Sequence, residues 1–327
     1  KSVFASVSQD FSDGLINIAI EGRYTEEEKT SYDRLSGSVS EATFDSFTPR
    51  FVAQYNVSEY SNVYASAAKG VKSGGFNSGN ILASERAFQP EENWTYEIGS
   101  KNQLFDQRLQ LNANLFYVDW SNLQTLSVSG NPAFRGTLTR NVGGATSYGV
   151  EIDLVARLTE ELQAGFGFSY ADPTYADDLI DPRYQLMRNS AGIPIVICDG
   201  VTCPSDGSIG GNQLSRQSKY QGSAFFSYTD ELPGWSGANF TIGGDVGYKS
   251  KQYIDPLLLA WAPDRFLVNL NASIAYDRFR LEGFVKNLFD EEYASGATYN
   301  LTGLRQVRYE GVLGEKRTVG VTLRYKY

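Results

Sequence analysis

The most specific reactive side chains in the sequence are two cysteines. Cys198 and Cys203 are separated by four residues, which does not fit a Cys-x-x-Cys metal or redox pair. The spacing is nevertheless short enough to close a small loop in an oxidising compartment. We therefore predict a disulfide between Cys198 and Cys203, and no metal site.

Histidine is absent from all 327 residues. Its absence removes Ser-His-Asp and Cys-His triads, His-containing zinc sites and a histidine pH switch. No nucleophile lies in a recognisable activating setting, so we expect neither an enzyme nor a cofactor. The net charge of −9 lacks the basic footprint of a nucleic-acid partner.

Arginine and tyrosine side chains gather in two segments without regular periodicity. These side chains are Arg183, Tyr184 and Arg188 in segment 176–216, and Tyr299, Arg305, Arg308 and Tyr309 in segment 290–314. Such groups could hold an anionic, aromatic ligand such as a ferric chelate through charge-assisted hydrogen bonds and stacking. The alternative is that each is an ordinary solvated loop residue.

The elements that would position these segments are strands, because apolar residues recur with period two along almost the whole chain. In 109–117 and 266–276 one face is apolar and the other is small or polar. We predict an all-β protein with thirteen strands. They are expected near 2–8, 15–29, 47–57, 61–71, 92–103, 108–128, 138–158, 162–175, 217–229, 238–254, 264–277, 278–289 and 315–327.

Short and long connections alternate without exception between these strands. The long ones are 30–46, 72–91, 129–137, 176–216, 255–263 and 290–314. This asymmetry is typical of an outer-membrane barrel, which has short periplasmic turns and long outer loops. The longest apolar run, 257–262, has six residues, far fewer than the roughly 20 that a membrane-spanning helix needs.

Aromatic residues tend to end the apolar faces, where they would sit at the lipid headgroups. Examples are Tyr117, Tyr170, Tyr228, Tyr248 and Tyr276; the alternative is the general preference of tyrosine for strands. Charged side chains fall on the opposite, lumen-facing side. We expect there Glu21, Arg23, Glu97, Lys101, Glu151, Asp153, Asp245, Lys249, Glu282, Lys286 and Arg324.

Four stretches together resemble the TonB-dependent outer-membrane receptors, in the carboxy-terminal part of their barrel. The stretches are FTPRFVAQYNVSEYSNVYASAAKGVKSGGFN at 47–77, QPEENWTYEIGSKNQLFDQRLQLNANLFYVDWSNLQ at 89–124, RNVGGATSYGVEIDL at 140–154 and VKNLFDEEY at 285–293, followed by an aromatic terminus. We expect the motifs themselves to be architectural, with glycines at bends and Asn and Asp at loop bases.

The resemblance implies that 1–327 is the carboxy-terminal part of an antiparallel transmembrane β-barrel of about 22 strands with a plugged lumen. Because a closed bacterial barrel has an even number of strands, we expect the plug domain and the first strands to lie outside this sequence. The lumen-facing charges would then contact either that plug or solvent.

The function that the resemblance implies is TonB-dependent active uptake of a scarce ligand across the bacterial outer membrane, and it favours a ferric siderophore. Its partners would be the TonB complex, reached through the absent amino-terminal region, the outer-membrane lipid and a small-molecule ligand. The alternatives are a passive porin-like channel, uptake of an oligosaccharide or cobalamin, and a soluble all-β binding module.

Overall fold

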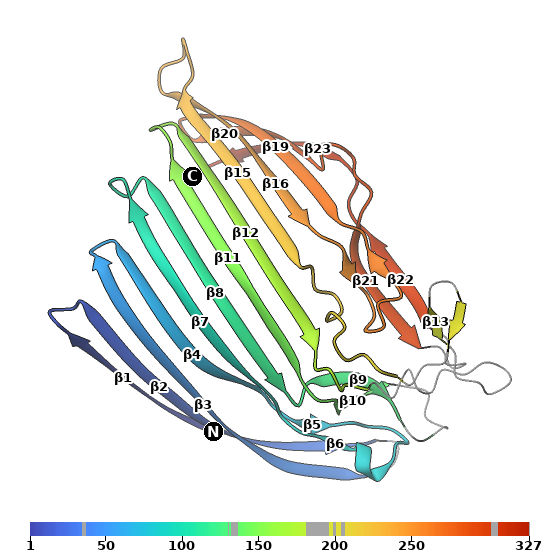
Figure 1. Ribbon diagram of the computed structural model, residues 1–327. Coiled ribbons are helices and arrows are strands. Elements are labelled where there is room, and N and C mark those ends of the chain that lie inside the picture. The colour runs from blue at the N-terminus through green and yellow to red at the C-terminus, as the bar shows by residue number, and fades with distance from the viewer. Residues whose placement is uncertain are drawn as a thin grey trace.

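One antiparallel sheet dominates the computed structural model (Figure 1). The structure describes residues 1–34, 37–129, 131, 137–180, 196–198, 201–203, 207–301 and 307–326. The thirteen strands of this sheet confirm the predicted number and order. They are β1 (Ser2–Phe11), β2 (Ile16–Tyr32), β3 (Val39–Ser58), β4 (Ser61–Lys72), β7 (Glu91–Leu104), β8 (Leu109–Ser121), β11 (Ala145–Arg157), β12 (Leu162–Tyr175), β15 (Tyr220–Glu231), β16 (Ala238–Lys249), β19 (Arg265–Tyr276), β20 (Phe279–Lys286) and β23 (Thr318–Tyr325).

The remaining elements are short and lie in the long connections. They are β5 (Gly75–Phe76), the 3-10 helix η1 (Ala83–Glu85), β6 (Ala87–Phe88), β9 (Gln124–Val128), β10 (Thr137–Asn141), β13 (Val196–Cys198), β14 (Val201–Cys203), β17 (Gln252–Tyr253), β18 (Trp261–Ala262), β21 (Ala294–Leu301) and β22 (Val307–Leu313). No helix among the described residues is long and apolar enough to cross a membrane.

Two predicted strands, 108–128 and 138–158, are each divided in the structure. The break in the first lies at Asn122, which has a φ of +54°. The break in the second lies at Gly143 and Gly144, where a Cβ on Gly144 would approach the Trp120 carbonyl oxygen to 2.6 Å. The outer pieces, β9 and β10, pair with each other instead of continuing the main sheet.

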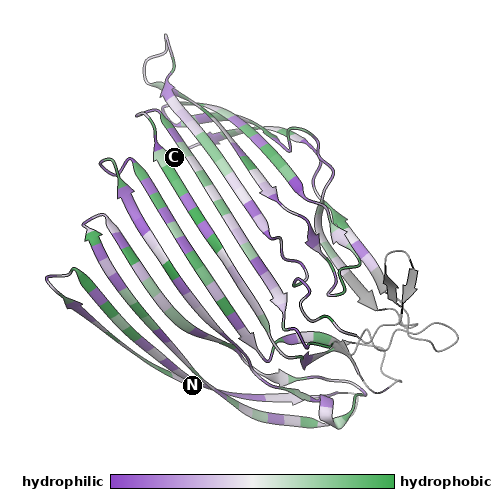
Figure 2. Ribbon diagram, viewed as in Figure 1, coloured by the Kyte–Doolittle hydropathy of each residue, from purple (hydrophilic) through white to green (hydrophobic). Residues whose placement is uncertain are grey.

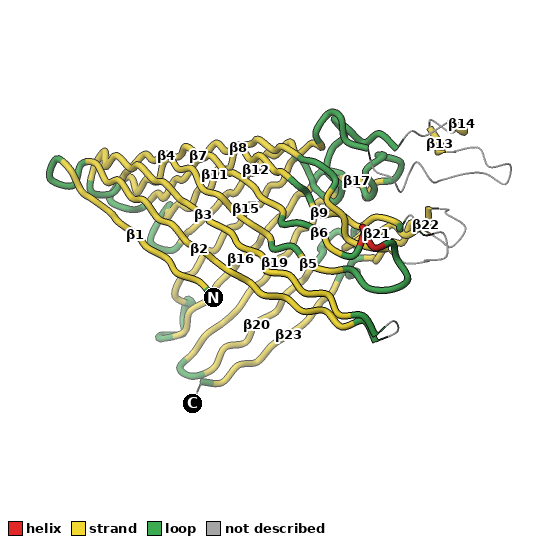
Figure 3. The backbone as a smooth tube through the Cα atoms, turned by 90° about the horizontal axis from the view of Figure 1, so that it is seen from below, coloured by secondary structure: helices red, strands yellow, loops and turns green. Residues whose placement is uncertain are grey.

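The connections alternate in length as predicted, so all long loops lie at one end of the sheet (Figure 1). The predicted loop 30–46 is shorter in the structure than the sequence indicates. β2 and β3 continue as a paired ribbon to Tyr32 and Val39, because alternating residues persist beyond the length that spans a bilayer. Seen from below, the sheet curves into an open trough with β1 and β23 at its two edges (Figure 3).

Apolar and polar residues alternate along each strand (Figure 2), and the apolar ones point to the convex side. On β23 the side chains of Val319, Val321 and Leu323 are 67–73% exposed. No second layer of the described chain covers this face, which is the arrangement expected when apolar side chains meet lipid.

Two belts of aromatic rings border the apolar face. At the long-loop end, Tyr96 and Tyr117 have ring centroids 6.4 Å apart, and further along the same belt those of Tyr170 and Tyr220 are 5.1 Å apart. At the short-turn end, rings pair as Tyr228 with Phe240, Trp235 with Tyr276, and Phe279 with Tyr325. From Tyr220 to Tyr228 the strand rises about 26 Å at roughly 3.3 Å per residue, which matches the apolar band of such barrels.

The packed core of the described chain lies in the loops rather than in the sheet. Val142, Tyr175, Leu179 and Ile209 form a buried cluster beyond the outer ends of β11 and β12. Backbone hydrogen bonds join the same segments, from the Ile209 amide to the Leu179 carbonyl (2.9 Å) for example. The outer loops therefore form a small, water-facing folded unit on top of the sheet.

Candidate functional site

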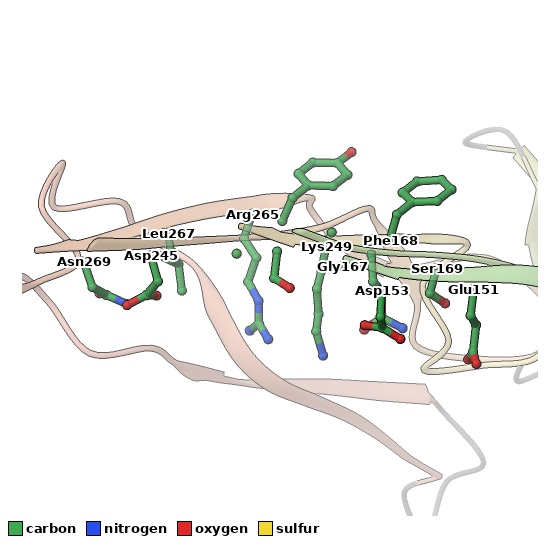
Figure 4. Close-up of a pocket in the computed structure, with 15 residues that line it drawn as sticks. Glu151, Asp153, Gly167, Phe168, Ser169, Asp245, Lys249, Arg265, Leu267 and Asn269 are labelled. Carbon is green, nitrogen blue, oxygen red and sulfur yellow. The ribbon is translucent and has the colours of Figure 1, made fainter. Parts of the chain in front are cut away.

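The concave face of the sheet carries a polar groove of about 550 Å³ over β11, β12, β15, β16 and β19. In Figure 4, Asp153, Lys249 and Arg265 project from one side of the sheet and Phe168 from the other. Register explains this, because every second residue of each strand shares a face. The groove is lined by Glu151, Asp153, Gly167, Phe168, Ser169, Gln221, Gly222, Ser223, Asp245, Gly247, Tyr248, Lys249, Arg265, Leu267 and Asn269.

The cationic side of the groove lies at the outer end of β16 and β19. Lys249 and Arg265 are directly opposite each other in the ladder. The Arg265 guanidinium donates a hydrogen bond to the Ala294 carbonyl oxygen (3.1 Å) and lies 5.3 Å from the centre of the Tyr293 ring. These contacts hold Arg265 in place without neutralising its charge.

The same pairing continues beyond the sheet in β17 and β18. Tyr253 pairs with Trp261 in the register set by Lys249 and Arg265. The Lys251 ammonium lies 4.8 Å from the centre of the Tyr253 ring and 5.7 Å from that of Trp261. A cationic and aromatic surface thus extends from the groove towards the loops.

The acidic side of the groove lies on β11. Asn114 donates a hydrogen bond to the Glu151 carboxylate (3.4 Å), and Asp153 stands two residues further along the same face. On β16 the Asp245 carboxylate accepts a hydrogen bond from the Asn269 amide (2.8 Å).

All eleven charged residues predicted to face the lumen lie on the concave face, as the strand registers require. Several make ordered contacts there. Arg50 pairs with Glu21 (3.2 Å), Arg324 with Glu282 (3.8 Å), and the Tyr64 hydroxyl hydrogen bonds to Glu97. Ion pairs and hydrogen bonds therefore join polar side chains at several points across the wall.

Most of the predicted ligand-binding side chains lie outside the described residues. This applies to Arg183, Tyr184, Arg188 and Arg305, and to the side chains of Tyr299, Arg308, Cys198 and Cys203. The backbones of Tyr299, Arg308 and Tyr309 share the β21–β22 hairpin. The cysteine backbones lie in the β13–β14 pair, where Cys203 is opposite Val196. The disulfide stays a prediction.

Tyr309 is the one predicted ligand-binding residue whose side chain is described, and its hydroxyl donates to the Asp255 carboxylate (3.1 Å). Asp255 is 0% exposed and also accepts hydrogen bonds from the backbone amides of Leu257 and Ala260 (2.9 and 3.0 Å). Tyr309 therefore ties the β21–β22 hairpin to loop 250–264. A second link runs from Arg216 to the Thr298 hydroxyl (2.9 Å).

The motif at 285–293 is architectural, as expected. Asn287 has a φ of +49° and is almost fully buried. Its side-chain amide donates to the carbonyls of Glu291 and Glu315 (2.9 and 3.1 Å), and its side-chain oxygen accepts from the Glu291 amide (2.9 Å). Its own backbone amide donates to the Asn269 side chain (3.0 Å).

The Ser73-Gly74 segment is anchored by the ribbon that β2 forms beyond the outer aromatic belt. The Ser73 hydroxyl and the Lys29 ammonium (3.4 Å) hold the pKa of Glu27 below its ordinary value. Lys29 also donates to the Gly74 carbonyl (2.8 Å). Nearby, the buried Glu85 pairs with Arg140, which joins η1 to β10.

Sequence reasoning placed Lys249 in the lumen but missed Lys251, Trp261 and Arg265 as members of a site. The sequence itself shows that Lys249 and Lys251 are two residues apart, which is the spacing of side chains on one face of a strand. The pairing across the connection 255–263 could not be predicted, because that connection reads only as a long loop that contains the apolar run 257–262. Across the described residues, no group of three or more acidic or Cys side chains could hold a metal ion.

A curved antiparallel sheet with an apolar convex face, two aromatic belts, long loops at one end and a polar lumen wall defines part of an outer-membrane transport barrel. Residues 1–288 match the family described as "TonB dependent receptor-like, beta-barrel". The chain belongs to this family. Members of the family are outer-membrane β-barrel receptors rather than enzymes, which places the chain in the bacterial outer membrane.

Curated relatives include the probable TonB-dependent siderophore receptor PiuA of Acinetobacter baumannii, 25% identical over 257 residues, which are 74% of this chain and 30% of PiuA. The metal-pseudopaline receptor CntO of Pseudomonas aeruginosa is 28% identical over 263 residues, 80% of this chain and 32% of CntO. The chain thus spans about a third of the length of these relatives.

Solved structures share the fold. The ferric yersiniabactin uptake receptor FyuA of Yersinia pestis aligns with a TM-score of 0.78 at 16% identity, over 100% of this chain and 45% of FyuA. The siderophore receptor PiuA of Acinetobacter baumannii aligns with a TM-score of 0.67 at 20% identity, over 95% of this chain and 40% of that protein.

Proposed function

We propose that the intact protein is a receptor for TonB-dependent active uptake of a ferric siderophore. The observation that carries this proposal is the family match over 1–288, together with two relatives whose names specify a siderophore and a metal chelate. The bonded polar lumen wall supports it, because transport through such a barrel requires a hydrophilic interior.

In the proposed architecture, 1–327 forms the carboxy-terminal part of the barrel, and the first strands and a plug domain precede it. The lumen-facing carboxylates and lysines outside the groove would contact the plug. The TonB complex would engage the amino-terminal region. The outer aromatic belt and apolar face would contact outer-membrane lipid, and the outer loops and groove would meet the ligand.

Uptake of radioactive iron by a bacterial host that lacks its own siderophore receptors tests this function. We expect the full-length gene to confer uptake from at least one ferric siderophore in a panel, and deletion of tonB to abolish it. A porin-like channel predicts the opposite pattern, in which permeability to small solutes is unchanged by the tonB deletion and high conductance is measured in planar bilayers.

Uptake of a chelate of another metal is the second candidate, and the name of the metal-pseudopaline receptor favours it. The same host distinguishes the two candidates when zinc or nickel replaces iron in the assay. Uptake of zinc or nickel chelates with no iron uptake would replace the ferric assignment while leaving active transport intact.

A further inference from the structure

The β21–β22 hairpin arises from one part of the sheet and is tied to another. In the chain it lies between β20 and β23, at one edge of the sheet. The Thr298 hydroxyl of β21 nevertheless accepts a hydrogen bond from Arg216 (2.9 Å), which precedes β15 by a few residues. Since β15 lies three strands from β20, or about 14 Å at ~4.8 Å per strand, the hairpin leans across the outer ends of β19 and β16.

The hairpin leans towards the lumen. Arg265, which projects from the concave face, donates a hydrogen bond to the carbonyl oxygen of Ala294, the first residue of β21 (3.1 Å). In Figure 4 the hairpin, drawn in faint red, lies on the side of the sheet to which Lys249 and Arg265 project. A register shift between Ala294 and Gly296 marks a bulge, the kind of irregularity that bends a ribbon. The hairpin therefore lies over the outer end of the polar groove.

Side-chain contacts keep the hairpin in this position. Among the described strands, β21 and β22 pair only with each other, and a two-stranded hairpin by itself is marginally stable in water. Two hydrogen bonds fasten it to neighbouring loops, one from Tyr309 to Asp255 (3.1 Å) and one from Arg216 to Thr298 (2.9 Å). Both join residues of the chain itself, so the hairpin can lie over the groove without a ligand.

The bond from Tyr309 to Asp255 can break without leaving the buried carboxylate unsatisfied. Asp255 is 0% exposed and also accepts hydrogen bonds from the backbone amides of Leu257, Leu259 and Ala260 (2.9, 3.3 and 3.0 Å). These three bonds lie within loop 250–264 and remain when the hairpin moves away. Tyr309, which is 38% exposed, then donates to water instead. The two positions of the hairpin differ by few net hydrogen bonds, and such a small difference allows both to be populated.

We propose that the β21–β22 hairpin is a gate over the outer end of the groove, and that Tyr309 is a positioning residue that holds the gate shut through Asp255. Arg216 and Thr298 form the second tie. Tyr309 acts on access to the lumen and does not contact the ligand. This inference goes beyond the proposed uptake function, because the gate controls entry whatever solute enters.

The test measures access to the groove and uses no transported ligand. Gln221, which lines the groove near the outer end of β15, is replaced by cysteine in the full-length receptor in intact cells. The rate at which an externally added sulfonated fluorescent maleimide modifies this cysteine is measured, and the chain without Gln221→Cys gives the background from Cys198 and Cys203. We expect Tyr309→Phe to raise the rate by about tenfold, because a hydrogen bond to a charged acceptor changes an equilibrium by a factor on the order of ten. Thr298→Val leaves Asp255 untouched and is expected to raise the rate as well.

The matched control is Tyr228→Phe, which removes another tyrosine–aspartate hydrogen bond, from Tyr228 to Asp230 (3.0 Å), at the short-turn end. We expect it to leave the labelling rate unchanged, and heat-modifiable migration on gels verifies that each variant is folded. The proposal is overturned if neither Tyr309→Phe nor Thr298→Val accelerates labelling, or if Tyr228→Phe accelerates it equally. Weaker chelate binding by Tyr309→Phe at an unchanged labelling rate would overturn it too, since Tyr309 would then be a ligand contact. Absence of TonB-dependent uptake of every chelate would defeat the uptake function and leave the labelling result standing.

Discussion

Replacing Asn287 with alanine should destabilise the barrel more than the small vacancy left by its carboxamide group suggests. The side chain makes three hydrogen bonds that alanine cannot make, two as donor to the Glu291 and Glu315 carbonyls and one as acceptor from the Glu291 amide. At about 1 kcal/mol each, their loss amounts to about 3 kcal/mol. The φ of +49° adds about 1 kcal/mol, because alanine tolerates the left-handed region less well than asparagine.

Asn122→Ala provides the matched control for the backbone term. Asn122 also has a positive φ, of +54°, and its side chain makes no hydrogen bond with the described chain. It should therefore lose only the conformational contribution, about 1 kcal/mol. The difference between the two variants isolates the three hydrogen bonds, at about 3 kcal/mol.

The measurement is reversible urea unfolding of the full-length receptor in lipid vesicles, followed by tryptophan fluorescence. A difference below about 1 kcal/mol between the two variants would refute the reasoning, because it would mean that water or neighbouring groups replace all three bonds. If the two variants lost the same free energy of unfolding, the stabilisation at Asn287 would come from its backbone conformation and not from the hydrogen bonds of its buried side-chain amide.

Three further outcomes follow from the loops. Arg140→Ala removes the ion pair between Arg140 and the buried Glu85 carboxylate, which joins η1 to β10, so hydrogen exchange in segment 77–90 should accelerate by tenfold or more, and unchanged exchange would contradict this. Gly144→Ala forces a Cβ to 2.6 Å from the Trp120 carbonyl and should lower stability by about 1–3 kcal/mol in a thermal unfolding scan. Because the pKa of Glu27 is lowered in the folded state, its contact with Ser73 should contribute at neutral pH and be lost as the pH falls below its ordinary value of 4.5; proteolysis near Ser73 should then rise in acid, and Glu27→Gln should remove that dependence.

The sheet could be predicted because every side chain that faces lipid must be apolar or aromatic, and this requirement leaves a pattern of alternating residues in the sequence. In β19, every second residue from Phe266 to Tyr276 is apolar or aromatic, and these are the residues on the convex face. The divisions at Asn122 and Gly144 were not predictable, since the first is a left-handed backbone conformation at Asn122 and the second depends on the close approach of Gly144 to the Trp120 carbonyl on a neighbouring segment. The same limit applies to the cationic side of the groove. Lys249 faces the lumen by alternation, but its partnership with Arg265 follows from a register that spans a loop of fifteen positions.

The buried cluster of Val142, Tyr175, Leu179 and Ile209 is surrounded by water, whereas the sheet below it is surrounded by lipid. The stability of the two parts should therefore depend on temperature in different ways. This cluster is held by apolar burial from water, which weakens on cooling, whereas the sheet below it is surrounded by hydrocarbon and depends on backbone hydrogen bonds that lipid cannot replace. A drop in temperature should loosen the loops while leaving the transmembrane wall rigid. In cold surroundings, the outer loops would therefore lose their packing before the barrel itself loses structure.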